Sequence, residues 1–224
     1  MGADHRFKAI LVQGAGMKRL AIGLALNGGT AKRVAHIGVI RALEENRIPI
    51  DYLAGTSGGA MVASDLTTRE KMIFREGKVA IACQASSSIP EFYTPVEIDG
   101  HILVDGGITE YVPISALASL GEMFTIGVNL GFEQGSSKKP RHLIEMIVQV
   151  TNFIAQQNAV VSERLADFMI HPDLGEFSSL DLNKASRMIR KAYRETLQIV
   201  PDLKTAIKVA RGAGRGSNAS KTSR

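Results

Sequence analysis

The chain has 224 residues, a net charge of +5 and a single cysteine. This length suits one sizeable domain with a hydrophobic core, and the lone cysteine excludes a disulfide within the chain. No apolar run reaches the roughly 20 residues that span a bilayer, and the N-terminus lacks a secretory signal pattern, so we expect a cytoplasmic protein. The positive charge suits peripheral contact with an anionic membrane. We expect no nucleic-acid binding, because no aromatic residues lie among the basic ones of the C-terminal tail.

Short apolar runs alternate with helical patterns along the chain. We expect strands or hairpins in residues 20–26, 50–57, 70–77, 96–107, 123–131 and 167–174. We expect helices in residues 34–45, 78–87, 113–120, 143–165 and 183–200. This alternation predicts one α/β domain over residues 1–200, with parallel strands joined by right-handed crossovers. A short helix and a basic, disordered tail are expected in residues 201–224.

Two of the expected helices have features that bear on their packing. The helix in residues 183–200 is expected to end before Pro201, because proline lacks the backbone donor that a helix interior needs. The helix in residues 143–165 carries apolar residues on one side, at Leu143, Met146, Ile147, Val150 and Ile154.

A serine flanked by glycines follows the second expected strand, in the pattern G-x-S-x-G at residues 55–59. This pattern is typical of a tight turn that exposes the serine hydroxyl, since glycines leave room for a carbonyl group to approach. Ser57 is therefore a candidate nucleophile. The pattern alone also fits a glycine-rich turn without any chemistry.

Two further segments favour the interpretation of Ser57 as a nucleophile. The segment "LNGGTAKRVAHIGVIRALEE" places a glycine loop between a strand and a helix, where backbone N–H groups can hold an oxyanion or a phosphate. The segment "LVDGGITEYVPISAL" places Asp105 before two glycines. A carboxylate there can accept the proton of a serine hydroxyl or orient a base.

Taken together, these segments resemble the patatin-like phospholipase family. The resemblance rests on "GGTAKRVAHIGVIRALEE", "GTSGG", "SSIPEFYTPVEIDG" and "VDGG", in that order, and covers roughly residues 20–195. It implies a three-layer α/β sandwich with a mostly parallel central sheet. It also implies a serine hydrolase that acts on phospholipids or related lipid esters, with no cofactor and no metal.

The resemblance also assigns roles to individual residues. It implies a catalytic dyad in which Ser57 attacks the ester carbonyl and Asp105 accepts the hydroxyl proton. Amides around Gly28, Gly29 and Thr30 would stabilise the oxyanion. The resulting acyl-enzyme would then be hydrolysed by water.

The glycine loop departs from the family pattern G-G-G-x-[KR]-G. Thr30 stands at the third glycine and Arg33 at the last, while Lys32 keeps the basic position. We expect Lys32 and Arg33 to contact the substrate or the loop.

The connection after Ser57 is unusually short, because Ser64 of the next motif follows after only six intervening residues. Family members have a helix and a cover in this place, so the domain lacks an insert between Gly59 and Leu66. The chain is then a shortened family member, a degenerate one, or one from which this segment is missing. With so short a connection we expect a shallow, wet site that favours short soluble esters.

The histidines offer an alternative base. His36 is expected to pack or to brace the glycine loop, whereas His171, at the end of a strand, could complete a Ser-His-Asp triad if the dyad is wrong. Two other functions stay open: a degenerate, non-catalytic lipid-binding protein and a nucleotide-binding α/β protein. The second would use "VQGAGMKR" or "NGGTAKR", neither of which is a complete dinucleotide-binding motif.

Overall fold

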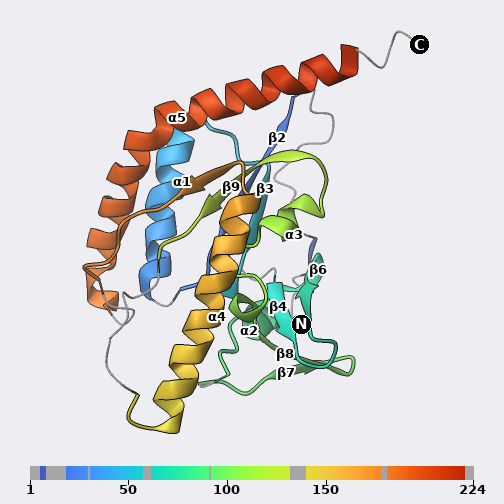
Figure 1. The fold of residues 1–224 in the computed structure, drawn as a ribbon, viewed down its shortest axis with the longest axis vertical. Coiled ribbons are helices and arrows are strands. Elements are labelled where there is room, and N and C mark those ends of the chain that lie inside the picture. The colour runs from blue at the N-terminus through green and yellow to red at the C-terminus, as the bar shows by residue number, and fades with distance from the viewer. Residues whose placement is uncertain are drawn as a thin grey trace, which may run out of the picture.

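The computed structural model describes residues 6–8, 19–29, 31–57, 62–90, 92–131, 140–177 and 181–219 (Figure 1). The strands are β1 Arg6–Lys8, β2 Ala21–Leu26, β3 Tyr52–Gly55, β4 Val62–Asp65, β5 Glu70–Ile73, β6 Glu76–Lys78, β7 Val96–Ile98, β8 His101–Asp105, β9 Met123–Val128 and β10 Phe168–Ile170. The helices are α1 Ala35–Glu45, α2 Val79–Ser86, α3 Ile114–Ala118, α4 Leu143–Leu165 and α5 Ala185–Ala219. Short 3₁₀ turns precede α1, at Ala31–Val34, and α5, at Leu182–Lys184. A third follows β8, at Gly106–Ile108.

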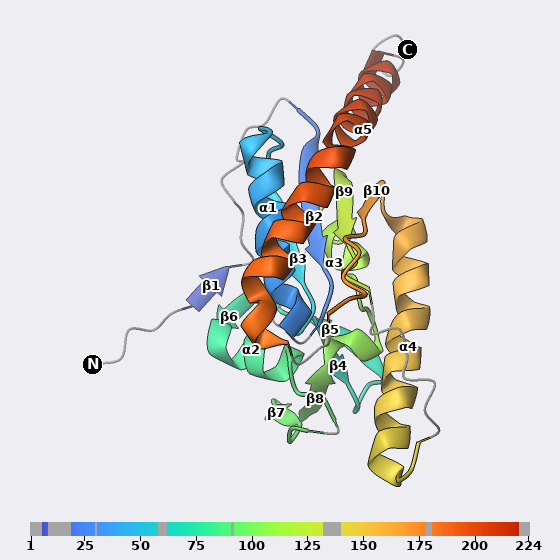
Figure 2. The ribbon, with the colours of Figure 1, turned by 90° about the vertical axis from the view of Figure 1, so that its left-hand side faces the viewer.

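A parallel sheet forms the centre of the fold, with strand order β10-β9-β2-β3. Helices α1 and α5 cover one face, and α3 and α4 lie on the other (Figures 1 and 2). Successive side chains of β2 point to opposite faces of the sheet. Ile22 and Leu24 pack under α1 and α5, whereas Ala25 packs on the side of α3. The predicted α/β class and three-layer arrangement are confirmed.

Helices α1 and α5 pack closely because α1 carries a glycine at their contact. A Cβ atom on Gly38 would overlap the carbonyl oxygen of Ile189 in α5. The helix α5 also continues through Pro201 to Ala219, so the expected end before this proline is wrong. Leu203 and Ile207, beyond the proline, are buried in the core, and this packing outweighs the lost hydrogen bond. Residues 220–224 of the expected tail lie outside the described residues.

A second sheet is antiparallel, with order β5-β4-β8-β7. Its β7–β8 hairpin turns at Asp99 and Gly100, both with positive φ, as the Asp-Gly pair predicted. A parallel bridge between Thr56 and Val62 joins this sheet to the end of β3. The antiparallel sheet therefore begins five residues after Ser57, at Val62, and residues 58–61 between them lie outside the described residues.

Helix α4 has the bounds predicted from sequence, but its apolar side faces solvent. The side that packs on the protein consists of small residues, among them Ala155, Ala159 and Ser162. The predicted apolar residues are 38–65% exposed, at Leu143, Met146, Ile147, Val150 and Ile154. Among the helices described, α4 included, none is both long and apolar enough to cross a membrane.

Candidate active site

The residues that follow three parallel strands meet in one cleft. Gly28 follows β2, Ser57 follows β3 and Asn129 follows β9, and all three line a cleft of about 1570 Å³. Ligands of open parallel sheets bind at this carboxyl end of the strands. Asp105, at the end of β8, lines the same cleft. The cleft is larger than the shallow site expected from the short connection, although its lining mixes polar and apolar side chains.

Ser57 has a strained backbone conformation directly after β3. Its φ is +60°, a value rare outside glycine that costs about 1–3 kcal/mol. Neighbouring contacts hold the turn, since the Thr56 N–H donates to Leu26 O at 3.1 Å and the Thr56 hydroxyl donates to Glu110 O at 2.8 Å. Ser57 is only 6% exposed, and its exposed part faces the cleft. The positive φ of Ser57 agrees with a tight turn at this residue, whereas Gly58 and Gly59 of the G-x-S-x-G pattern lie outside the described residues.

Asp105 is fixed mainly through its backbone. The Asp105 N–H donates to Ser88 O at 2.9 Å, and the Ser64 hydroxyl donates to Asp105 O at 2.8 Å. Its carboxylate oxygen Oδ1 accepts the Gly107 N–H at 2.8 Å. Both Ser57 and Asp105 are described residues, and no direct hydrogen bond joins their side chains.

Tyr111 lies between the two halves of the site, and no motif or spacing pointed to it. A Cβ atom on Gly28 would lie 3.3 Å from the Tyr111 ring and 3.5 Å from Ser57 Cβ, and one on Gly107 would also lie 3.3 Å from the ring. Burial raises the pKa of the Tyr111 hydroxyl, against the lowering effect of its hydrogen bond with Asn27. Tyr111 is therefore a neutral spacer that touches both glycine segments.

The glycine loop only partly resembles the predicted oxyanion hole. Gly28 and Gly29 line the cleft, and Gly29 has a φ of +155°, which side chains rarely adopt. In this conformation, however, the Gly28 N–H donates to Tyr111 O at 3.3 Å. Thr30 lies outside the described residues. Lys32 and Arg33 also line the cleft, and Lys32 is 3% exposed.

The same segments carry the similarity to known proteins. The family model described as patatin-like phospholipase matches residues 24–73 and 65–118, which include the glycine loop, the serine turn and the Asp-Gly-Gly segment. Over these residues the chain is similar to the patatin-like phospholipase family. The two matched stretches overlap at residues 65–73, directly after the short connection.

Individual relatives agree with this patatin-like assignment. The chain is 27% identical over 197 residues to an uncharacterised NTE family protein of Mycobacterium bovis, covering 58% of this chain and 54% of the relative. It is 25% identical over 183 residues to a patatin-like phospholipase domain-containing protein of Caenorhabditis elegans, covering 50% of this chain but 14% of the relative. A lysophospholipase of Mycosarcoma maydis is 48% identical over 59 residues, which are 26% of this chain and 3% of the relative. The chain thus spans about half of one relative and small parts of the others.

His36 and His171 are not among the described residues that line the cleft with Ser57 and Asp105. His36 is 7% exposed, and its Nε2 atom lies 3.1 Å from Asn27 O, next to the glycine loop. Burial lowers the pKa of His36 to about 4, despite the opposing effect of that hydrogen bond. His171 is half exposed, lies 3.9 Å from Glu163 and is not among the residues that line the cleft. The position of His171 gives no support to a triad.

Asparagines join the ends of two parallel strands behind the patatin-like cleft. The Asn27 side chain donates to Asn129 Oδ1 at 3.4 Å and accepts the Leu130 N–H at 3.1 Å. Asn129 in turn donates to Glu163 of α4 at 2.8 Å. Sequence reasoning missed both asparagines, because each is a single polar residue directly after an apolar run. Among the residues described, no group of three or more His, Cys, Asp and Glu side chains is placed to hold a metal ion.

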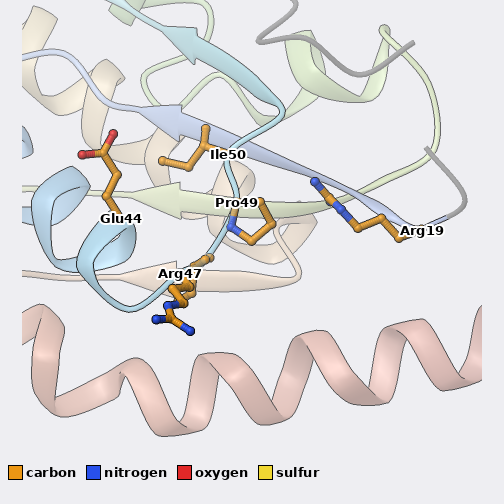
Figure 3. Close-up of a pocket in the computed structure, with 6 residues that line it drawn as sticks. Arg19, Glu44, Arg47, Pro49 and Ile50 are labelled. Carbon is orange, nitrogen blue, oxygen red and sulfur yellow. The ribbon is translucent and has the colours of Figure 1, made fainter. Parts of the chain in front are cut away.

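A second pocket lies at the other end of the sheet. It has about 400 Å³ and is lined by Arg19, Glu44, Arg47, Ile48, Pro49 and Ile50 (Figure 3). These residues precede β2 and β3, whereas ligands of parallel sheets bind where the strands end. None of the predicted site residues lines it.

Proposed function

We propose that this chain hydrolyses ester bonds of phospholipids or related lipids. Support comes from the family, from a relative named lysophospholipase, and from the cleft that contains a nucleophile candidate and a base candidate. The observation that carries the proposal is Ser57, which has a φ of +60° at the end of β3 and lines a cleft shared with Asp105.

The proposed chemistry uses two side chains and backbone donors. Ser57 Oγ attacks the ester carbonyl carbon while its proton passes to the Asp105 carboxylate, and the alcohol leaves with a proton. A water molecule then cleaves the acyl-enzyme with Asp105 as base. The oxyanion is bound by the amides of Gly28, Gly29 and Thr30, which requires the Gly28 N–H to exchange its present acceptor, Tyr111 O. Lys32 and Arg33 contact the loop or the polar part of the substrate.

A set of three variants tests the dyad. We expect Ser57→Ala and Asp105→Asn each to lower kcat/KM for p-nitrophenyl butyrate by about 10⁴-fold. His171→Ala serves as the matched control and should keep turnover. Circular dichroism must show that each variant is folded. Loss of turnover in folded His171→Ala would replace the dyad by a triad.

A second candidate is a degenerate lipid-binding protein without catalysis. It is favoured by the Gly28 N–H donating to Tyr111 O, which leaves this donor of the predicted oxyanion hole occupied. Ester hydrolysis that depends on Ser57 excludes this candidate. Lipid binding without hydrolysis supports it.

We also propose that the domain, which extends past the predicted end at residue 200 because Leu203 and Ile207 are buried in its core, lacks the family's insert between Gly59 and Leu66. The overlap of the two matched stretches at residues 65–73 supports this, because one continuous match would not repeat those residues. Restoring a relative's insert at this point should raise activity on long-chain lipids more than on short esters. Equal effects on both would contradict the proposal.

A further inference from the structure

Helix α4 carries a long apolar surface, interrupted at Gln157 and Asn158, that no described element covers. We define the α4 stripe as seven residues at helical spacing that are 38–65% exposed: Leu143, Met146, Ile147, Val150, Ile154, Val161 and Leu165. Monomeric proteins rarely expose so long an apolar surface unless it binds a partner or a membrane.

The stripe adjoins the candidate active-site cleft on helix α4. Phe153 and Val160 of α4 are exposed beside the stripe and also line the cleft. From another segment, Phe92 is 66% and Tyr93 is 62% exposed, and both line the cleft too. An occupant of the stripe would therefore lie at the mouth of the cleft.

The charges around the stripe distinguish between two possible occupants. Its flanking charges are cationic, with Arg141 before the helix and the exposed Arg164 near its end. The acids of α4, Glu145 and Glu163, line the cleft, as does Arg141, and Glu145 is paired with Arg141 at 3.2 Å. Arg141 is thus matched by Glu145 within the helix, whereas Arg164 is an exposed cation at the other end of the stripe. An anionic lipid surface would complement Arg164 and the net charge of +5, whereas a second copy would carry the same positive net charge.

We propose that α4 docks this protein onto an anionic phospholipid bilayer, with the stripe buried at the headgroup boundary and the cleft mouth against the lipid. A helix with one apolar side and flanking cations binds membranes in this orientation. Docking would let a lipid enter the cleft along Phe153 and Phe92 without crossing water. The proposal rests on the proposed lipid substrate, and it adds the surface by which the protein reaches that lipid.

The absence of tryptophan from the chain allows a direct test. Val150→Trp places a single fluorophore on the stripe, and Ile37→Trp places a matched one on α1, where Ile37 is 56% exposed on the other face of the sheet. Both are made together with Ser57→Ala, so that lipids are not consumed. With phosphatidylcholine–phosphatidylglycerol vesicles, Val150→Trp should shift its emission to the blue and lose most of its acrylamide quenching, whereas Ile37→Trp should not change.

A second pair of variants measures binding itself. Val150→Glu should lower the fraction that sediments with these vesicles by about tenfold, because it places a charge where an apolar side chain is buried, while Ile37→Glu should not. Pure phosphatidylcholine should bind more weakly than the mixture. Equal binding to both lipids would overturn the anionic part of the proposal.

Two results would overturn the docking surface. One is an unchanged Val150→Trp emission on adding vesicles. The other is a blue shift that appears without vesicles and grows with protein concentration, which would assign the stripe to a second copy. Hydrolysis of a soluble monomeric ester by the chain with Ser57 tests the proposed function separately, since no lipid surface is present.

Discussion

Ser57 and Asp105 belong to two sheets of different construction. Ser57 follows a parallel sheet with helices on both faces, whereas Asp105 ends a strand of a smaller antiparallel sheet whose buried apolar cluster is only Ala63, Ala85 and Leu103. The two sheets meet at the bridge between Thr56 and Val62. The distance between nucleophile and base therefore depends on this junction rather than on either sheet alone.

A substitution at Gly106 should disrupt the junction. Among the variants that test this comparison, we expect it to have the largest effect on stability and kcat together. A Cβ atom on Gly106 would overlap Val62 O, so Gly106→Ala should lower the free energy of unfolding by about 3 kcal/mol and displace Asp105. Gly38→Ala makes a similar overlap between α1 and α5, far from the junction. In urea titrations both should be destabilised, but only Gly106→Ala should lose kcat in its folded fraction.

Gly212→Ala provides the control for these two glycines. No heavy atom lies within 4 Å of the added methyl group, so this variant should gain about 0.5–1 kcal/mol of stability in α5. If Gly106→Ala keeps the stability and the kcat of the parent protein, the junction does not position Asp105.

Variants of Tyr111 test whether its ring is needed to fill the space between the two glycine segments. Tyr111→Ala should cost about 3–5 kcal/mol, because it removes a buried ring that contacts Gly28 and Gly107. Tyr111→Phe keeps the ring and loses only the hydrogen bond with Asn27, at about 1 kcal/mol. Thermal unfolding compares the two, and equal losses would mean that the hydroxyl, not the ring, matters.

The stability of the parallel sheet and its helices should also decrease in acid, because of His36. Its pKa is about 4 when folded and about 6.5 when unfolded, so the unfolded chain takes up the proton first as pH falls. The stability is fully present above pH 6.5, and up to about 3 kcal/mol should be lost as pH falls to 4. His36→Gln, which can still donate to Asn27 O, should lack this part of the slope in urea titrations. An identical slope would assign the sensitivity to another group.

The antiparallel sheet should lose stability at a lower pH than the parallel sheet, and the loss should be smaller. Burial alone would raise the pKa of Asp65, but hydrogen bonds from Thr68, His101 and Thr67 outweigh it and lower the pKa. The stability that Asp65 contributes is thus present above about pH 4 and lost as pH falls below it. The loss should be smaller than for His36, because the His101 side chain is 37% exposed to solvent. Asp65→Asn should be less stable than the parent at pH 6, with the difference shrinking below pH 4.

Local patterns predicted much of the fold and the candidate site. The bounds of α4, the Asp99–Gly100 hairpin and the turn at Ser57 each depend on a few neighbouring residues, and the structure has all three. What could not be predicted depends on contacts between distant segments. Tyr111 contacts Gly28 across the junction, and Pro201 stays inside α5 because residues after it are buried.

The environment of α4 shows the same limit. An amphipathic pattern states which side chains share a side, but not whether that side is covered. The five predicted apolar residues do share a side, and the structure turns that side to solvent, since the small residues Ala155 and Ala159 make the packed contact. The size of the cleft was missed for a related reason, because much of its lining comes from α4.

The most direct test of the central claim is labelling with a fluorophosphonate probe, followed by mass spectrometry of the modified peptide. An activated Ser57 at the end of β3 should be labelled and no other residue should be, and Asp105→Asn should lose the label while it stays folded. Labelling at a different serine, or ester hydrolysis that continues in a chain whose Ser57 stays unlabelled, would contradict the account.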